Sequence, residues 1–268
     1  MIDHGKRNLL GVLINAIDYD AAVAKVLGAA IDGRRCTTSA LAVHGVMTGV
    51  LDRRHRHRLN HLDLVVPDGQ PVRWAINSLH STGLPDRVYG PRLTLLLCKA
   101  AAEAGIPVFF YGSRDEVVRR LANRMREICP GLIVAGTLPS RFRPLDAGEQ
   151  AELVDTIRAS GARIVFIGLG CPRQEVFAYE MGKRLDLPLI AVGAAFDYYS
   201  GMLREPPLAI QRAGLQWLYR LIQEPRRLWR RYLIQNSQFV GLFVLQALRL
   251  WRPDPSRCEE PAAEAVCG

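Results

Sequence analysis

The segment Leu64-Val65-Val66-Pro67-Asp68-Gly69 carries the clearest signal of the fold class in this chain. Its three apolar residues predict a short buried strand, and Pro67 ends that strand. Asp68 and Gly69 then stand between the strand and a helical pattern that begins at Gln70. In an open α/β sheet, ligands bind just outside the carboxyl ends of the strands. A carboxylate at this position makes Asp68 a candidate catalytic group.

The same unit of strand, turn and helix recurs along the chain. Further apolar runs predict strands at residues 9–17, 35–38, 107–111, 133–136, 163–167 and 189–192, and helical patterns separate most of them. This alternation predicts an α/β fold, with a mostly parallel, Rossmann-like sheet and helices on both faces. Since parallel strands end at a common edge, residues that follow different strands should gather there.

The charge is concentrated in one segment. The chain has 268 residues and a net charge of +9. Residues 204–252 contain nine Arg, no Lys and two acidic residues, which is a net charge of +7. Such an excess predicts an anionic partner, which is a nucleic acid, a membrane surface or a phosphorylated substrate. We expect an α/β core at 1–203, a basic appendage at 204–252 and a disordered tail at 253–268, which is rich in Pro, Glu and Ala.

The basic appendage has an amphipathic pattern. Arg227, Arg230 and Arg231 recur at helical spacing after Pro225, and apolar and aromatic residues occupy the positions between them. This pattern predicts a helix that lies on an anionic membrane surface. The alternative is a helix that packs on the core or on another subunit. The chain has no signal-peptide pattern at its start and no uncharged apolar run of membrane-spanning length.

A glycine turn follows the predicted strand at 163–167. Gly168-Leu169-Gly170 resembles the start of a dinucleotide-binding fingerprint, but Arg173 stands where the third glycine belongs. The turn still offers backbone N–H groups to a phosphate. Gln174 and Glu175 follow in the first turn of the next helix and can face the same cleft. For Glu175 the alternative is that it only complements the helix dipole.

Other polar residues follow or flank predicted strands. Asp197 comes after the strand at 189–192, either as a helix cap or as a contact to a base or sugar. Arg87 lies in a polar loop and can meet a phosphate. Thr37 and Ser39 either cap the following helix or face a ligand. Together with Asp68 these groups suit a nucleotide-sugar site, where one carboxylate deprotonates an acceptor hydroxyl and donors stabilise the departing diphosphate.

No metal site is expected from the sequence. The triplet Asp18-Tyr19-Asp20 could belong to a metal–nucleotide site or to the start of a helix. We favour the second, because Asp20 has the position of a helix N-cap. The basic, histidine-containing run at 53–58 is expected to be a solvated loop or helix face. The six cysteines are scattered, without a C-x-x-C pair or a zinc-type cluster, which predicts reduced thiols.

Taken in order, five segments resemble the WecG/TagA/CpsF family of bacterial glycosyltransferases over about residues 10–239. The segments are Val66-Pro67-Asp68-Gly69, Arg87-Val88-Tyr89-Gly90, Gly168-Leu169-Gly170-Cys171-Pro172-Arg173-Gln174-Glu175, Val192-Gly193-Ala194-Ala195-Phe196-Asp197, and Gly214-Leu215-Gln216-Trp217-Leu218-Tyr219-Arg220 with Glu224-Pro225-Arg226-Arg227. Each segment alone is a weak signal, whereas all five in this order are specific.

The resemblance implies a function. It implies inverting, metal-independent transfer of a sugar from a UDP-sugar, typically UDP-N-acetylmannosamine or a relative such as a uronic acid or hexose. The acceptor it implies is a polyprenyl-diphosphate-linked sugar at the inner face of the cytoplasmic membrane, in cell-surface polysaccharide synthesis. No cofactor is implied beyond the UDP-sugar donor, and no nucleic acid partner.

The resemblance also implies roles for individual residues. Asp68 matches the proposed catalytic base, Arg87 a contact to the diphosphate, and Gln174 and Asp197 contacts to the nucleotide-sugar. In the family, a C-terminal appendage docks at the membrane and closes over the site. Its basic residues are matched here by Arg220, Arg227 and Arg230.

The chain departs from the family pattern at two positions. Ser39 stands where the family often has Asn, and Arg92 stands where many members have an acid. These departures bear on the donor sugar and on the acceptor contact.

Two other functions fit parts of the sequence. An NAD(P)-binding oxidoreductase needs a complete glycine fingerprint on the first strand, which residues 11–15 lack. A non-enzymatic adaptor that binds membrane or nucleic acid needs the charge but not Asp68. Whichever function holds, including the glycosyltransferase, we expect the apolar surface of the appendage to drive self-association when no membrane is present.

Overall fold

The computed structural model describes residues 1–262 and 266, without the side chains of Arg227 and Arg231. Its strands are β1 (Asp3–Leu9), β2 (Val12–Ile17), β3 (Cys36–Leu41), β4 (Leu64–Pro67), β5 (Val108–Gly112), β6 (Val134–Leu138), β7 (Ile164–Gly168) and β8 (Pro188–Ala191). Its helices are α1 (Tyr19–Asp32), α2 (Val43–Leu51), α3 (Arg53–His61), α4 (Gln70–His80), α5 (Gly90–Glu103), α6 (Asp115–Ile128), α7 (Ala147–Ala159), α8 (Arg173–Met181), α9 (Ala194–Tyr199), α10 (Leu208–Arg212), α11 (Gln216–Gln223) and α12 (Pro225–Ala247).

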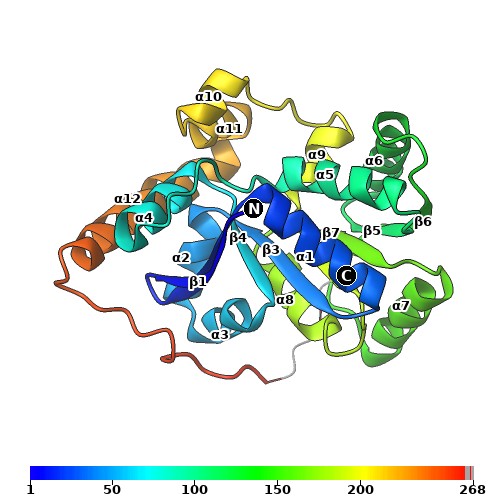
Figure 1. The fold of residues 1–268 in the computed structure, drawn as a ribbon, viewed down its shortest axis with the longest axis horizontal. Helices are drawn as coiled ribbons and strands as arrows, with labels where there is room; N and C mark the ends of the chain where they lie inside the picture. The colour runs from blue at the N-terminus through cyan, green and yellow to red at the C-terminus, as the bar shows by residue number, and fades with distance from the viewer. Residues whose placement is uncertain (263–265, 267–268) are drawn as a thin grey trace.

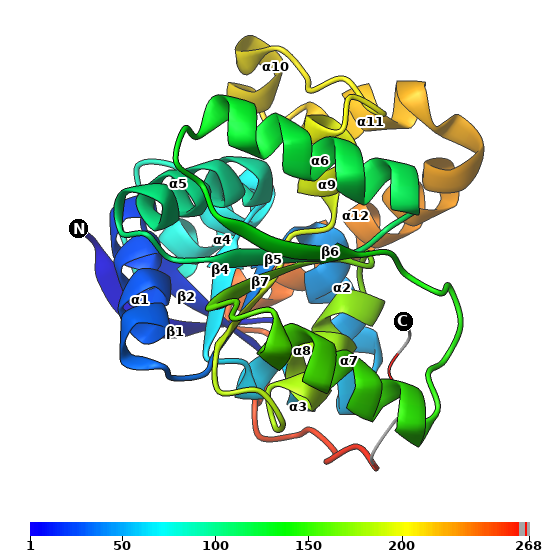
Figure 2. The same cartoon turned by 90° about the vertical axis from the view of Figure 1, so that its right-hand side faces the viewer.

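Six of these strands form one parallel sheet in the order β4-β3-β8-β7-β5-β6 (Figure 1). Helices α1, α5, α6 and α9 pack on one face, and α2, α3, α4, α7 and α8 on the other. Figure 2 shows α6 and α9 above the central strands and α7 and α8 below them. Because both faces are covered, most strands are apolar throughout rather than alternating. The predicted fold class is confirmed.

Alternate residues of a strand enter the two halves of the core. Val165 and Ile167 of β7 pack with Leu189 on one face, whereas Phe166 packs with Ile190 on the other. The side chains of these five residues have no exposed surface. This packing fixes the register of the central strands, since a shift by one residue would exchange the two faces.

The first predicted strand differs from the prediction. Residues 9–17 do not form one strand of the main sheet, because Leu10 and Gly11 adopt positive φ values of 56° and 88° and reverse the chain. The result is an antiparallel hairpin, β1–β2, that forms a separate two-stranded sheet. Gly11, which adopts this conformation without strain, was the local signal for the turn.

Two boundaries near the N-terminus also differ from the prediction. Helix α1 begins two residues earlier than expected, so Asp18 rather than Asp20 is its N-cap, and its Oδ1 accepts from the Ala21 N–H at 2.9 Å. The segment predicted to end at Thr38 continues as strand to Leu41.

The basic run at 53–58 lies in α3, where His55 and Arg58 are buried rather than solvated.

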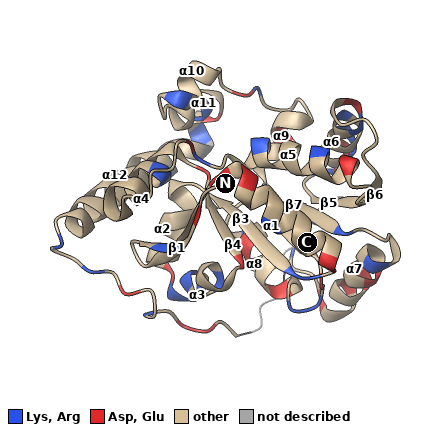
Figure 3. Cartoon of the chain, in the orientation of Figure 1, with Lys and Arg blue, Asp and Glu red and all other residues tan. Residues whose placement is uncertain are grey.

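The C-terminal helices lie beside the carboxyl edge of the sheet. Helix α12 packs against α2 and α4 and buries Leu228 and Phe239. Arginines occur on α10, α11 and the first half of α12, whereas the second half of α12 has none (Figure 3). In the part of the chain that the structure describes, no helix combines the length and the apolar character that crossing a membrane requires.

The segment after α12 is irregular. Its backbone carbonyls accept hydrogen bonds from the core, from Asn8 Nδ2 to Pro253 at 2.7 Å and from Asn60 Nδ2 to Pro255 at 3.2 Å. The division of the chain into core, appendage and disordered tail stays a prediction.

Candidate active site

A cavity of about 580 Å³ lies along the carboxyl edge of the parallel sheet. Residues that follow all six strands line it, among them Ala42, Asp68, Ser113, Ser140, Gly170 and Gly193. The strand order places Asp68, after edge strand β4, at one end and Ser140, after edge strand β6, at the other. A cavity of this size accommodates a ligand of the size of a nucleotide-sugar.

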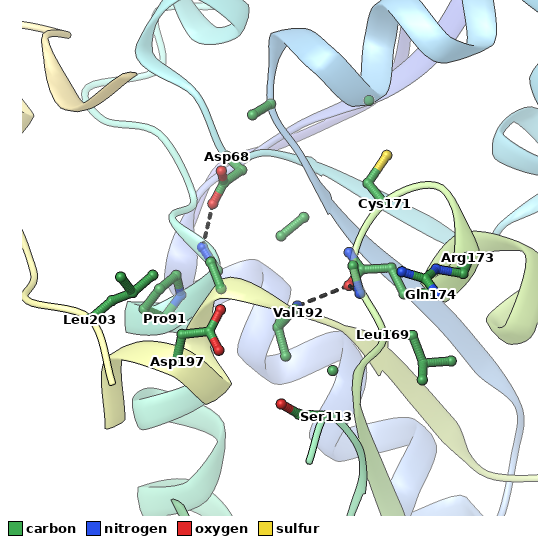
Figure 4. A pocket seen from close by; sticks show the side chains of 18 of the residues that line it. Asp68, Pro91, Ser113, Leu169, Cys171, Arg173, Gln174, Val192, Asp197 and Leu203 are labelled. Atoms are coloured by element: carbon green, nitrogen blue, oxygen red, sulfur yellow. Dashed lines mark hydrogen bonds between the residues drawn. The ribbon is translucent and has the colours of Figure 1, made fainter. Parts of the chain in front are cut away.

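Asp68 lines the first end of this cavity (Figure 4). Its Oδ1 accepts a hydrogen bond from the Gly90 N–H at 2.6 Å, at the start of α5. Burial raises the pKa of the Asp68 carboxyl, while the charge of Arg87, the Gly90 N–H and the charge of Arg220 act to lower it. A carboxylate that is more basic than usual and borders a cavity is suited to take a proton from a ligand.

Asp197 borders the same cavity from α9 (Figure 4). It lies inside that helix, which begins at Ala194, so the alternative that it caps the helix is wrong. The two carboxylates predicted to face a common cleft therefore do so, one after β4 and one after β8. The sheet order, in which only β3 separates these strands, brings them together.

Gln174 connects the two glycine turns of the cavity wall. Its Oε1 accepts from the Gly170 N–H at 3.2 Å and from the Gly193 N–H at 3.0 Å. Its Nε2 donates to Glu175 Oε1 at 2.9 Å. The sequence predicts that the N–H groups of the Gly168–Gly170 turn are open to a phosphate, but the Gly170 N–H already donates to Gln174.

Glu175 is fully buried at the start of α8. Its Oε1 accepts from the Ser39 hydroxyl at 2.9 Å as well as from Gln174. Burial raises the pKa of the Glu175 carboxyl, and the hydrogen bonds from Gln174 and Ser39 oppose this shift. Ser39 does not cap a helix; it lies within β3, and its hydroxyl donates to Glu175, which lines the cavity.

Arg87 and Thr37 are placed differently from the prediction. Arg87 is buried over the Tyr89 ring, and it donates to Gln216 Oε1 at 2.5 Å and to Gln211 Oε1 at 3.0 Å. It therefore acts on Asp68 through its charge and does not line the cavity. Thr37 lies near the amino end of β3, where its N–H and hydroxyl both donate to Asp63 Oδ2 at 2.8 Å, away from the cavity.

The arginines of the C-terminal segment divide into two groups. Arg220 of α11 lines the cavity and pairs with Glu224 at 3.3 Å. Arg230 is exposed on α12, with its guanidinium 5.8 Å from the centre of the Trp229 ring. The side chain of Arg227 lies outside the described residues.

Sequence reasoning missed the far end of the cavity. Ser113, Arg114, Ser140, Phe142 and Arg173 line it, and all follow β5, β6 or β7. Their position after strands was a usable signal, but only the sheet order shows that these strands are neighbours. Among the described residues, no group of three or more His, Cys, Asp or Glu side chains is placed to hold a metal ion.

Two comparisons with known proteins bear on this cavity. The model of the glycosyl transferase WecG/TagA/CpsF family matches residues 7–253. A protein of Bacillus spizizenii (strain W23) is 33% identical over 182 residues, which are 67% of this chain and 68% of the relative. That relative is named N-acetylglucosaminyldiphosphoundecaprenol N-acetyl-beta-D-mannosaminyltransferase.

Proposed function

This chain belongs to the WecG/TagA/CpsF family of glycosyltransferases, and from that premise we propose that it transfers N-acetylmannosamine, or a closely related sugar, from a UDP-sugar to a polyprenyl-diphosphate-linked N-acetylglucosamine. The name of the Bacillus spizizenii relative supports the sugar and the acceptor. The observation that carries the proposal is Asp68, a carboxylate of raised pKa at one end of a cavity that fits a nucleotide-sugar. Family membership decides against the oxidoreductase and the non-enzymatic adaptor.

Asp68 is the general base in this proposal. It removes the proton from the attacking hydroxyl of the acceptor sugar as that oxygen bonds to C1 of the donor sugar. The bond between C1 and the diphosphate oxygen breaks on the opposite side, so the configuration at C1 inverts. UDP leaves with the electron pair of that bond, and the proton stays on Asp68 until solvent removes it.

The cationic groups of the cavity orient the two substrates. Arg114 and Arg173 border it after β5 and β7, and Arg220 borders it from α11. We assign the donor diphosphate to the neighbourhood of Arg173 and the nucleoside to the end with Ser113, Ser140 and Phe142. The donor sugar then points toward Asp68. The acceptor enters beside Arg220, which lies on the segment that carries the exposed apolar helices.

The C-terminal helices supply a surface for the membrane that carries the acceptor. Trp229, Leu233, Val240 and Val244 of α12 are exposed at helical spacing, and Arg226 and Arg230 are exposed beside the first two. An exposed apolar stripe with flanking arginines suits an anionic bilayer surface, on which the helix lies. On this basis the protein acts as a peripheral enzyme at the inner face of the cytoplasmic membrane.

A panel of UDP-sugars tests the proposed function. The protein is incubated with each sugar and a short-chain lipid-diphosphate N-acetylglucosamine, and released UDP is measured. We expect UDP-N-acetylmannosamine to give the fastest release, and only when the acceptor is present. Absence of acceptor-dependent release with every UDP-sugar would overturn the proposal.

The same assay in excess EDTA tests metal independence. We expect the rate of UDP release to stay within about twofold, because the arginines of the cavity can neutralise the departing diphosphate. A loss of activity that added Mg²⁺ or Mn²⁺ restores would contradict this expectation.

The pH profile of transfer should show that the charge of Arg87 lowers the pKa of Asp68. Of the influences that lower the pKa of Asp68, the charge of Arg87 is the largest. Removing it in Arg87→Met therefore raises that pKa further, and the acidic limb of kcat/KM moves to higher pH. The control is Arg92→Met, which removes a charge that is not among the influences on the pKa of Asp68, and it should leave the limb in place. An unmoved limb in Arg87→Met would contradict the assignment of this limb to Asp68.

A further inference from the structure

The wall of the cavity between β7 and β8 includes two glycine turns. Gly170 and Gly193 belong to the turns after these strands, and Gln174 Oε1 accepts a hydrogen bond from both N–H groups. The turns approach closely, since a Cβ added to Gly193 would lie 2.6 Å from Gln174 Oε1 and 3.2 Å from Gly170 Cα. The width of the cavity at this point therefore depends on where the Gln174 amide lies.

Glu175 determines which way the Gln174 amide faces. A glutamine amide can turn by 180°, which exchanges its oxygen and its nitrogen. Glu175 Oε1 already accepts from the Ser39 hydroxyl, and it also accepts from Gln174 Nε2. With an acceptor at this point, the amide nitrogen must face Glu175 and the amide oxygen must face the two glycines. Gln174, Glu175 and Ser39 are all buried, so water does not replace these contacts.

We propose that Glu175 is a positioning residue for donor binding, which acts through Gln174 to hold the turns after β7 and β8 at the separation that fits the donor diphosphate and sugar. This inference rests on the proposed function. In this role Glu175 neither contacts the substrate nor merely complements the helix dipole; it orients another side chain. Ser39 takes part in the same arrangement from the neighbouring strand β3.

Two substitutions of Glu175 separate orientation from charge. Glu175→Met keeps the length of the side chain and removes the acceptor, so the Gln174 amide loses the partner that orients it. We expect the KM for the donor to rise about tenfold, in line with the loss of one buried hydrogen bond. The kcat and the KM for the acceptor should stay within about twofold. In Glu175→Gln the amide oxygen replaces Oε1, and all three parameters should remain close to those of the wild type.

A third variant approaches the same contact from the other side. Gly193→Ala places a methyl carbon 2.6 Å from Gln174 Oε1, too close for the amide to stay in place, and we expect the same selective rise in the donor KM. Gly28→Ala is its control, because no atom outside its own helix lies within 4 Å of the added Cβ. Gly193→Ala also tests the inference if Glu175→Met does not fold.

The outcomes are distinct from those that test the proposed function. A wild-type protein without acceptor-dependent UDP release refutes the function, and calorimetry with UDP then still shows whether Glu175→Met and Gly193→Ala weaken nucleotide binding. An unchanged donor KM or UDP affinity in both variants refutes the positioning role. Equal losses in Glu175→Gln and Glu175→Met would also refute it, because charge rather than amide orientation would then matter.

Discussion

Asp68→Asn is expected to lower kcat for sugar transfer by about 10²–10⁴-fold, the range typical for loss of a general base. The amide oxygen of Asn can still accept the hydrogen bond that the Gly90 N–H donates at 2.6 Å, so the local structure is kept. What is lost is a group that can take the proton of the acceptor hydroxyl. The dissociation constant of the UDP-sugar should stay within about threefold. Single-turnover transfer and calorimetry measure the two quantities.

Asp197→Asn is the matched control for this variant. It removes a second carboxylate from the same cavity, one that by the family resemblance contacts the nucleotide-sugar and does not take the proton. We therefore expect its effect mainly in the donor KM. Normal turnover by Asp68→Asn would refute the base assignment, and a larger loss of kcat in Asp197→Asn would move that role to Asp197.

The largest expected effect on localisation comes from the exposed face of α12. Arg226→Gln/Arg230→Gln should reduce binding to anionic vesicles about 30-fold at low salt, since each arginine near such a surface contributes about 1 kcal/mol. Trp229→Ser/Leu233→Ser removes large side chains that are 51% and 67% exposed, and it should weaken binding to neutral vesicles as well. Vesicle co-sedimentation at increasing salt separates the two contributions.

Substitutions are preferable to a truncation after Ala213. Removing the rest of the chain would also remove Leu228 and Phe239, which are buried, and it would expose the core. Arg119→Gln/Arg124→Gln is the charge-matched control, because both arginines are exposed on α6. If this control weakened binding as much as the α12 pair, or if neither α12 pair weakened it, the proposed docking surface would be wrong.

The fold class was predictable because its signals are local. A buried parallel strand needs an apolar run, and a turn at its end needs Gly, Pro or Asp, as in the stretch from Leu64 to Gly69. The hairpin β1–β2 was missed because β1 is almost entirely polar, whereas the alternation of Leu10, Val12 and Ile14 runs through the turn at Leu10 and Gly11. In that region periodicity alone did not show that the chain reverses direction.

The candidate site was predictable in part. Asp68, Gln174, Glu175 and Asp197 follow strands, and the rule that parallel strands end at one edge was enough to bring them together. The same rule misplaced Thr37, because the local pattern ended β3 three residues too early and assigned this residue to the carboxyl edge. It lies instead near the amino end of the strand, next to Asp63.

The local pattern of the chain was enough to predict the α/β class and the edge of the sheet that carries the cavity, and it pointed to Asp68 as the candidate base. These depend on interactions between residues close in the chain. Two contacts became visible only once the chain was folded: the Ser39 hydroxyl donates to Glu175 across 136 residues, and the Arg87 guanidinium donates to Gln216 across 129 residues. Such contacts depend on strand order and on how the C-terminal helices pack, which no local pattern of side chains encodes.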